Sequence, residues 1–322
     1  MPIAFSSNTV RRTAETDAGR TERMSEQMTG RDGSRVLLFG ATGATGRVLL
    51  HRLDASGIGV DALTRSDAQA HRFCAPQVFW HRGALPDWPL LSRDITHIIC
   101  LGPGDVFVEW LARQAAPPGL RQIIAFGSTS ADSKIDSSCA PERDLAVRLR
   151  SAQSLLAEHG TRLGVPWTLL RPTLIYGGGD DSVARIGRWI RRRRVYPLLI
   201  GRGALARRQP VHARDLAQAV CACIDQRSAF NRSFDLPGGE CLSLRALIQR
   251  ISRACGRLPL PLPIPLFAAL HVLGRLDLIP AHAALQVSGL GRLERDQLFD
   301  GTPAAAALGY APGPFMPDSA EW

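Results

Sequence analysis

An apolar stretch that runs directly into a glycine-rich loop constrains this sequence more than any other feature. Val36–Phe39 is followed by the loop Gly40-Ala-Thr-Gly43-Ala-Thr-Gly46, and then by the helical segment Arg47–Ala55. In such a unit the first glycine permits a tight turn, the second lets backbone N–H groups approach an anion, and the third lets the helix pack closely on the sheet. This order predicts a strand–loop–helix unit that opens a parallel sheet.

The loop predicts a binding site for the pyrophosphate of a dinucleotide. The N-terminus of the helix that follows it offers unpaired N–H groups to an anion. We therefore expect the loop to bind NAD(P)(H); the alternative is a glycine turn that holds no ligand. The residues expected at the cofactor here are Gly40, Thr42, Gly43, Ala44, Thr45, Gly46 and Arg47.

The end of the second predicted strand bears on which dinucleotide is bound. An acidic residue there would accept the adenine-ribose 2′-hydroxyl of NAD, whereas an arginine favours the 2′-phosphate of NADP. The strand ends in Leu63-Thr64-Arg65-Ser66, and Asp61 lies too early in it for the ribose role. Arg65, helped by Arg47, predicts a preference for NADP(H), with NAD(H) as the other cofactor; alternatively, Arg65 is one more surface arginine.

From Arg35 onward, short apolar runs alternate with helix-length segments, as is typical of a parallel sheet with helices on both faces. The predicted strands are Val36–Phe39, Val60–Thr64, Val78–Trp80, His97–Leu101, Gln122–Phe126 and Trp167–Arg171. The predicted helices between them are Arg47–Ala55, Val106–Gln114 and Arg143–His159, the last with a buried stripe of Leu145, Leu149, Ala152 and Leu156.

These elements predict an α/β protein with a Rossmann doubly wound parallel sheet in residues 34–176. Residues 177–322 should form a smaller mixed substrate lobe, interleaved with the Rossmann core, that contains a helix over Val183–Ile190 and a short strand near Leu198–Ile200. Residues 1–33 show no apolar periodicity, so we expect them to be disordered.

Composition narrows the possible partners. The formal net charge is +10, but Lys134 is the only lysine and the arginines are spread along the chain. Without an aromatic stacking pattern or a recognition-helix motif, we expect no nucleic-acid partner. The seven cysteines include no Cys-x-x-Cys pair and follow no signal-type apolar segment, which predicts a cytoplasmic protein without a metal site.

A peripheral membrane or protein contact is expected through residues 258–290, and a separate basic run at Arg191–Arg194 is a second candidate for such a contact. Arg191–Arg194 could contact phosphates or anionic head groups; the alternative is a solvated helix end that carries cations near its negative pole. Leu258–Pro265 alternates Leu and Pro, and Leu266–Leu273 is amphipathic but too short to span a bilayer. The alternative for Leu266–Leu273 is a helix that caps the core.

Four motifs occur in a fixed order along the chain. They are Gly40-Ala-Thr-Gly-Ala-Thr-Gly-Arg47, Ala125-Phe-Gly-Ser-Thr-Ser130, Leu169-Leu-Arg-Pro-Thr-Leu-Ile-Tyr-Gly177 and Val211-His-Ala-Arg-Asp-Leu-Ala217. Together they resemble the extended and atypical short-chain dehydrogenase/reductases, the NAD-dependent epimerase/dehydratase-like group. The resemblance runs from about Arg35 to about Pro314, and it implies an oxidoreductase or epimerase-type enzyme that acts on a small carbonyl, alcohol or nucleotide-sugar-like substrate.

The same resemblance implies roles for residues outside the glycine loop. Gly102 and Pro172 would contact the cofactor, although Gly102 could also mark a plain turn. A hydroxyl at the end of the fifth strand would bind the substrate oxygen, with Thr129 as the first candidate and Ser128 as the second; alternatively, these hydroxyls cap the strand and its loop. His212 would serve in packing and helix capping.

The sequence departs from the family at the catalytic pair. In the family, a Tyr-x-x-x-Lys pair exchanges a proton with the substrate oxygen, but this chain places Leu145 and Leu149 at those positions. Lys134 and Tyr176 are the remaining candidates for the proton donor. If neither serves, the proton comes from water, or the chain is a noncatalytic dinucleotide-binding module with a structural or redox-sensing function.

Overall fold

The computed structural model describes residues 33–66, 75–88, 93–256, 259–265, 268–269 and 294–322. The predicted N-terminal tail lies outside the described residues except for Gly33, and so does most of the segment 258–290. No helix in the described part of the chain is long and apolar enough to cross a membrane.

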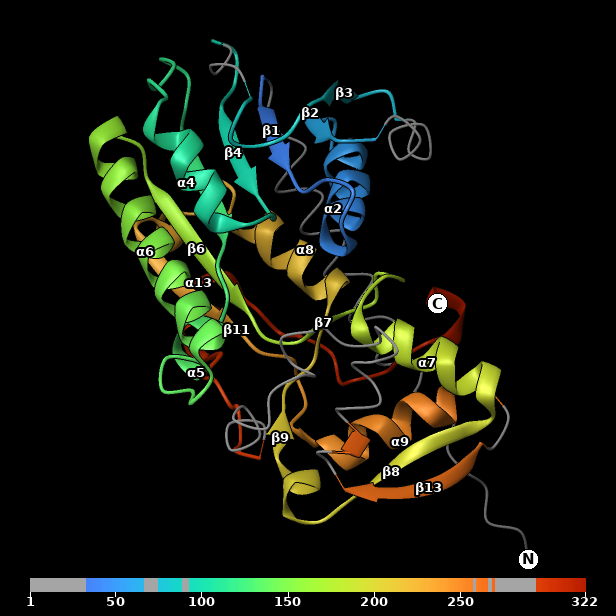
Figure 1. Ribbon diagram of the computed structural model, residues 1–322. Coiled ribbons are helices and arrows are strands. Elements are labelled where there is room, and N and C mark those ends of the chain that lie inside the picture. Colours follow the sequence, from blue (N-terminus) through green and yellow to red (C-terminus); the bar gives the residue numbers. More distant parts are fainter. Residues whose placement is uncertain (1–32, 67–74, 89–92, 257–258, 266–267, 270–293) are drawn as a thin grey trace, which may run out of the picture.

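Seven parallel strands form the central sheet, which confirms the predicted doubly wound α/β fold (Figure 1). Their order across the sheet is β11-β6-β5-β4-β1-β2-β3. The strands are β1 (Arg35–Phe39), β2 (Gly59–Thr64), β3 (Val78–Arg82), β4 (His97–Cys100), β5 (Gln122–Phe126), β6 (Trp167–Pro172) and β11 (Arg232–Leu236). The sequence predicted the first six; β11 comes from the C-terminal half and pairs in parallel with β6.

Helices cover both faces of this sheet because its central strands bury both sets of side chains. In β1, Val36 and Leu38 pack into one apolar core, and Leu37 and Phe39 pack into the other. The first core is closed by α2 (Ala44–Ala55) and α8 (Ala213–Cys223), and the second by α4 (Gly104–Ala112) and α6 (Ala140–Leu163). Helix α8 follows residue 177 in the chain, so the C-terminal half contributes to the Rossmann core.

A third core belongs to the C-terminal lobe, which lies below the carboxyl ends of the strands in Figure 1. Its main elements are α7 (Ser182–Arg193), β8 (Val195–Ile200), α9 (Leu244–Ala254) and β13 (Leu260–Pro265). The shorter elements there and at the sheet are α5 (Ser130–Ser133), β7 (Ile175–Tyr176), β9 (Arg207–Arg208), β10 (Val211–His212), β12 (Leu242–Ser243) and α13 (Thr302–Leu308). Side-chain caps begin α7 and α9, where Asp181 accepts from the Ala184 N–H and Ser243 accepts from the Ala246 N–H.

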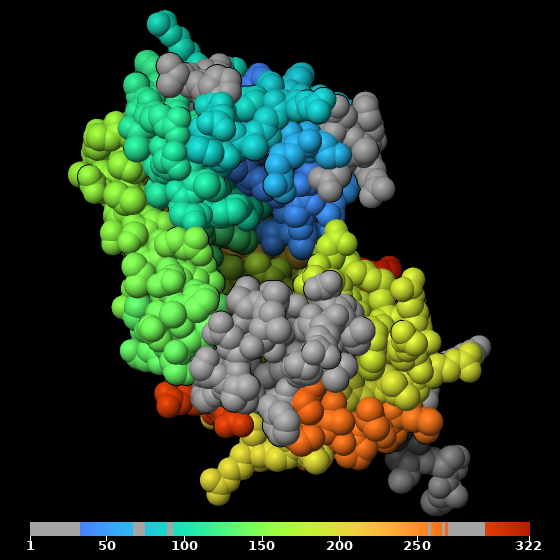
Figure 2. Space-filling model, in the orientation of Figure 1, coloured from blue at the N-terminus to red at the C-terminus, as the bar shows by residue number. Residues whose placement is uncertain are grey.

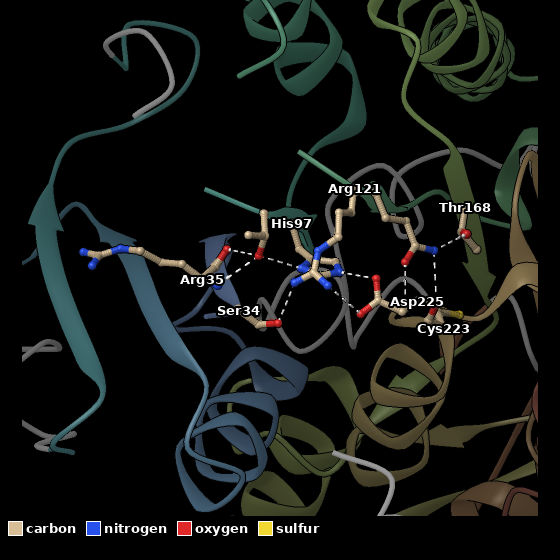
Figure 3. A network of polar contacts seen from close by, with 9 residues as sticks. Ser34, Arg35, His97, Arg121, Thr168, Cys223 and Asp225 are labelled. Carbon is tan, nitrogen blue, oxygen red and sulfur yellow. Dashed lines mark hydrogen bonds and ion pairs between the residues drawn. The ribbon is translucent and has the colours of Figure 1, made fainter. Parts of the chain in front are cut away.

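A polar network closes the amino ends of the strands (Figure 3). His97, the first residue of β4, is fully buried, and its Nε2 lies 3.0 Å from an Asp225 carboxylate oxygen. Arg121 lies 3.6 Å from the other oxygen of Asp225 and donates to the Ser34 hydroxyl at 2.7 Å. One carboxylate therefore joins the starts of two neighbouring strands.

Gln122 extends this network across the sheet. It is the buried first residue of β5, and its Oε1 accepts from the Asp225 N–H at 2.9 Å. Its Nε2 donates to the Thr168 hydroxyl and to the Cys223 carbonyl, both at 3.1 Å. The amide thus uses its acceptor and a donor on buried groups, which is the condition for placing it inside the protein at little cost.

Candidate cofactor and substrate site

The first and third glycines of the loop occupy positions that a side chain would disturb, whereas the second is exposed. Gly40 has φ +81°, and a Cβ added there would meet the backbone of Leu101 at 3.0 Å. A Cβ on Gly46 would lie 2.2 Å from the Gly40 carbonyl oxygen, so the third glycine lets α2 pack against the loop. At Gly43 the only described atom within 4 Å of such a Cβ is the Gly40 oxygen, and the residue is exposed. The loop is therefore packed at both ends and open in the middle.

The exposed middle of the glycine loop, at Gly43, coincides with the N-terminus of α2. Gly43 is its N-cap, and in the described structure no side chain caps the first turn. The N–H groups of this turn have no partner within the helix, so they suit an anion such as a pyrophosphate. Thr45 in this turn is buried, whereas Thr42 before it is partly exposed.

A second glycine-containing segment, Gly177–Gly179, lies against this loop, and the sequence analysis did not assign it to the site. The ideal Cβ of Gly178 would lie 2.2 Å from the Cβ of Ala44, so only glycine fits there. Arg47 donates hydrogen bonds to the carbonyls of Thr42 and Gly178, and thereby ties the loop to the C-terminal lobe. The run Gly177-Gly178-Gly179 after Tyr176 was the available sequence signal. Figure 2 shows the surface hollowed between blue residues of α2 and yellow-green residues of this lobe.

The second strand ends as the sequence analysis expected, with an exposed arginine. Arg65 follows β2 directly, and Arg82, which pairs in register with Thr64, ends the neighbouring strand β3 and is also exposed. Asp61 is buried inside β2, where Arg35 lies 2.5 Å and His81 2.6 Å from its carboxylate oxygens. Burial alone would raise the pKa of Asp61, but the hydrogen bonds from Arg35 and His81 outweigh it and lower the pKa.

A mostly apolar cavity of about 220 Å³ lies between α4 and α6, next to the loop that contains Gly102. Leu149 lines this cavity, and both Leu145 and Leu149 are only partly buried. The predicted buried stripe therefore holds for Ala152 and Leu156 but not for Leu145 and Leu149. Gly102 has no described atom within 4 Å of an added Cβ, which leaves room for a ligand against its backbone.

The two hydroxyl candidates at the end of β5 differ in their surroundings. Thr129 is buried, and its hydroxyl donates to the Pro172 carbonyl at 3.2 Å. Ser128 is partly exposed, and its oxygen accepts from the Ser130 N–H at 3.1 Å. The hydrogen of the Ser128 hydroxyl has no described acceptor, whereas that of Thr129 is directed at the backbone. The geometry favours Ser128 as the donor to a substrate and reverses the expected order of the two.

Lys134 is held away from any reaction by a buried carboxylate. The sequence made this lysine a candidate proton donor, but it is 7% exposed and its Nζ lies 3.9 Å from Glu142 at the start of α6. Glu142 is 2% exposed and accepts from the Ser137 hydroxyl at 2.6 Å. Moving Lys134 to a substrate would leave a buried charge unpaired, which is costly.

The hydroxyl of Tyr176, the other candidate proton donor, is also engaged by protein groups. Its hydroxyl donates to the Pro314 carbonyl at 3.3 Å and accepts from the Met316 N–H at 3.1 Å. Its ring is buried edge-on against His212 and Phe315. Burial raises its pKa. These contacts make Tyr176 a link between β7 and the C-terminal segment.

His212 has the capping role that the sequence analysis assigned to it. Its Nδ1 accepts from the Arg214 N–H at 2.9 Å at the start of α8, and its Nε2 lies 3.3 Å from Glu321. Among the described residues, no group of three or more His, Cys, Asp and Glu side chains is placed to hold a metal ion.

Comparison with known proteins finds similarity to an epimerase and to a reductase. No protein-family profile matches the chain. UDP-glucose 4-epimerase of Vibrio cholerae is 24% identical over 167 residues, which cover 49% of this chain and 50% of that protein, so the match spans about half of its length. The (4-alkanoyl-5-oxo-2,5-dihydrofuran-3-yl)methyl phosphate reductase of Streptomyces griseus is 25% identical over 69% of this chain and 74% of that protein.

Solved structures share the fold over nearly the whole chain. The epimerase Mth375 of Methanothermobacter thermautotrophicus superposes with a TM-score of 0.69 at 13% identity and covers 90% of both chains. UDP-glucuronic acid 4-epimerase of Bacillus cereus, solved with UDP-glucuronic acid and NAD, gives a TM-score of 0.62 at 13% identity, over 87% of this chain and 94% of that one. The terminal R domain of the myxalamid pathway gives 0.65 at 18% identity, over 89% and 88%.

Proposed function

We propose that this chain, an extended short-chain dehydrogenase/reductase by its fold and its sequence relatives, binds NADP(H) at the carboxyl edge of its sheet and reduces or epimerises a small carbonyl, alcohol or nucleotide-sugar-like substrate. The observation that carries the proposal is the glycine loop: it is packed at Gly40 and Gly46 and exposed at Gly43, and it opens on the uncapped N-terminus of α2. A pyrophosphate fits these donors.

The preference for NADP(H) rests on two exposed arginines. Arg65 and Arg82 end adjacent parallel strands, so both lie at the edge where the adenine ribose of a dinucleotide would sit. Asp61, the acidic residue of β2, is engaged by Arg35 and His81 and does not reach that edge. Two guanidinium groups favour a 2′-phosphate, which carries charge, over a 2′-hydroxyl.

The cofactor would supply or accept a hydride at the substrate carbon. The Ser128 hydroxyl, with Thr129 beside it, would donate a hydrogen bond to the substrate oxygen and so stabilise the charge that develops there. With leucines at 145 and 149, and with Lys134 and Tyr176 held by protein groups, the proton for this oxygen would come from water. Leu149 would replace the usual lysine with an apolar contact near the cofactor.

Cofactor binding is tested first, by thermal shift of the full chain with NADPH, NADP, NADH and NAD. A ligand that binds only the folded state raises the unfolding temperature by mass action. We expect the two phosphorylated dinucleotides to stabilise the protein most. Stabilisation by NADH but not by NADPH would contradict the role of Arg65, and no stabilisation by any of the four would overturn the proposal.

Turnover is tested separately, with NADPH and a panel of carbonyl substrates that includes nucleotide sugars. Ser128→Ala should lower kcat/KM by about a hundredfold, the usual loss for one oxyanion donor. Its matched control is Ser154→Ala on the exposed face of α6, which should leave the rate unchanged. An unchanged rate in Ser128→Ala would remove this residue from the mechanism.

A second function, a noncatalytic dinucleotide-binding module, is favoured by one specific observation. Leu149 lines the cavity beside Gly102, and neither it nor the partly buried Leu145, the two residues that the sequence analysis aligned with the catalytic pair, can transfer a proton. This function predicts tight NADPH binding without oxidation of NADPH by any substrate in the panel. A measurable turnover that Ser128→Ala abolishes would exclude it.

A further inference from the structure

The C-terminal lobe carries a surface on which positive charge and exposed aliphatic side chains meet. We define this basic–apolar surface by Arg191–Arg194 at the end of α7 and by Leu260 and Leu262 on β13. The four arginines are exposed, and Leu260 and Leu262 are 71% and 53% exposed. The Leu260 N–H donates to the Arg194 carbonyl at 2.9 Å, so the two parts of the surface are adjacent.

The charge of this surface is not balanced by the lobe itself. Residues 182–214 and 241–265 contain no aspartate or glutamate. In the described part of the chain, Arg191–Arg194 make no ion pair. Asp181, the acidic residue that precedes them, caps the opposite end of α7, and Glu240 and Asp296 are paired with Arg250 and Arg207. The surface therefore fits a partner with negative charge.

The edge of β13 excludes one kind of protein partner. The strand pairs in parallel with β8, from Leu260 opposite Val195 to Pro265 opposite Ile200. Successive residues of a strand direct their backbone groups to opposite sides, and the Leu260 N–H points toward β8. The outward positions are then 261, 263 and 265, all prolines, which have no N–H. A further strand cannot pair with this edge.

The same prolines lower the cost of bringing this edge to a membrane surface. An unpaired N–H costs free energy near lipid, and this strand has no outward N–H donors, while its outward carbonyls can accept from water at the head-group level. Leu260 and Leu262 add aliphatic side chains that suit the boundary between head groups and acyl chains. Exposed aliphatic side chains give bases nothing to stack on, which weighs against single-stranded nucleic acid.

We propose that the basic–apolar surface binds anionic membranes peripherally, with Arg191–Arg194 at the phosphate groups and the Leu–Pro edge of β13 at the head-group boundary. Figure 1 places β8 and β13 at the end of the C-terminal lobe, away from the central sheet, so binding there leaves the dinucleotide edge accessible. This proposal is independent of the proposed catalytic function.

Flotation of the full chain with vesicles tests the proposal. Phosphatidylcholine vesicles that contain phosphatidylglycerol should bind the protein, and vesicles of phosphatidylcholine alone should not. Because each basic residue at such a surface contributes about 1 kcal/mol, Arg192→Gln with Arg193→Gln should weaken binding about thirtyfold. Leu260→Ser with Leu262→Ser should weaken it about tenfold and reduce the penetration of the protein at high ionic strength.

The matched control removes two exposed arginines elsewhere, Arg148→Gln with Arg227→Gln, and should bind like the unchanged protein. Thermal unfolding of each variant shows that it remains folded. If the control weakened vesicle binding as much as the Arg192 and Arg193 variant, binding would depend on the net charge of the protein and not on this surface, and the proposal would be overturned. Binding to a short DNA duplex with none to anionic vesicles, or equal binding to neutral vesicles, would overturn it as well.

Discussion

The two edges of the central sheet, built from the same strands, have opposite properties. At the amino edge, the buried His97 and Gln122 and the partly buried Asp225 satisfy one another, with contacts at 3.0 Å or less. At the carboxyl edge, Gly43 is exposed on the uncapped α2, and Ser128 and Arg65 are exposed or partly exposed. The amino edge contributes to stability, whereas the carboxyl edge keeps its hydrogen-bonding groups for a ligand.

This difference indicates which end of a doubly wound sheet is the better place to look for a binding site. Buried polar groups must be paired to be tolerated, so a network such as the one around Asp225 is explained by folding alone. Unsatisfied N–H groups at an exposed helix N-terminus cost little in water and become useful when an anion arrives. Substitutions at the two edges should therefore separate stability from dinucleotide binding.

The largest effect is expected from substitution of Gly46, because this residue should matter both for the stability of the fold and for dinucleotide binding. A Cβ there would lie 2.2 Å from the Gly40 carbonyl oxygen and 2.6 Å from that of Ala41, and backbone cannot move aside cheaply. Gly46→Ala should lower the free energy of unfolding by about 3 kcal/mol or more and abolish the NADPH-dependent thermal shift. Urea unfolding and thermal shift measure the two effects.

Gly119→Ala is the control for Gly46→Ala, because the closest described atom to its added Cβ is the Arg93 carbonyl oxygen at 3.9 Å. It should change the free energy of unfolding by less than about 0.5 kcal/mol. If Gly46→Ala unfolded and bound NADPH like the unchanged protein, the close packing of the loop against α2 would be wrong.

The next largest effect is expected from substitution of Asp225 at the amino edge, which should lower the free energy of unfolding without changing dinucleotide binding. Asp225→Ala leaves the fully buried His97 Nε2 and the Arg121 guanidinium without their shared carboxylate, which should cost about 2–3 kcal/mol in urea unfolding. Asp225→Asn retains an acceptor and tolerates the φ of +56°, so it should cost less. NADPH affinity should stay within about twofold in both, since the cofactor edge is at the other end of the strands. A loss of affinity equal to that of Gly46→Ala would break the distinction between the edges.

The sequence predicted the carboxyl edge far better than the amino edge. The glycine loop, the six strands from β1 to β6 and the exposed Arg65 follow from local patterns, because turn geometry and apolar periodicity are properties of neighbouring residues. The network around Asp225 joins residues 34, 97, 121, 122, 168 and 225, and β11 reaches β6 from 64 positions further along the chain. Such pairings depend on tertiary packing, which periodicity does not contain.

At the candidate site, the sequence names candidate residues but does not contain their three-dimensional environments. Lys134 lies in a polar stretch, and nothing nearby in the sequence shows that Glu142 turns back to meet it. Ser128 and Thr129 are adjacent hydroxyls, and only the position of the Pro172 carbonyl distinguishes them. The Gly178 contact with Ala44 likewise requires the loop and the lobe to come together in space.

Asp61 lies in β2 between the two edges, and its pairing with Arg35 and His81 should contribute to stability rather than to cofactor binding. Its pKa is lowered in the folded state, so its ionised form contributes stability above the unfolded pKa of about 3.9, and that contribution is lost as pH falls through the lower folded pKa. Asp61→Asn should cost about 2 kcal/mol at neutral pH, and the difference from the unchanged protein should shrink below about pH 4. A difference that is constant from pH 7 to pH 3 would contradict the charge-assisted pairing with Arg35 and His81.

Arg65 provides the sharpest test of the carboxyl edge, with the smallest expected effect. The residue is exposed, so Arg65→Gln should leave urea unfolding unchanged, in contrast to Asp225→Ala. It should weaken NADPH binding about tenfold, since a charge-assisted hydrogen bond to phosphate contributes about 1.5 kcal/mol or more, and leave NADH binding unaffected. Titration with both dinucleotides measures the ratio of the two affinities, and Arg113→Gln at the C-cap of α4 is the matched exposed control. An equal loss for NADPH and NADH would place Arg65 at the pyrophosphate or adenine rather than at the 2′-phosphate; Arg82→Gln would then have to carry the selectivity by itself.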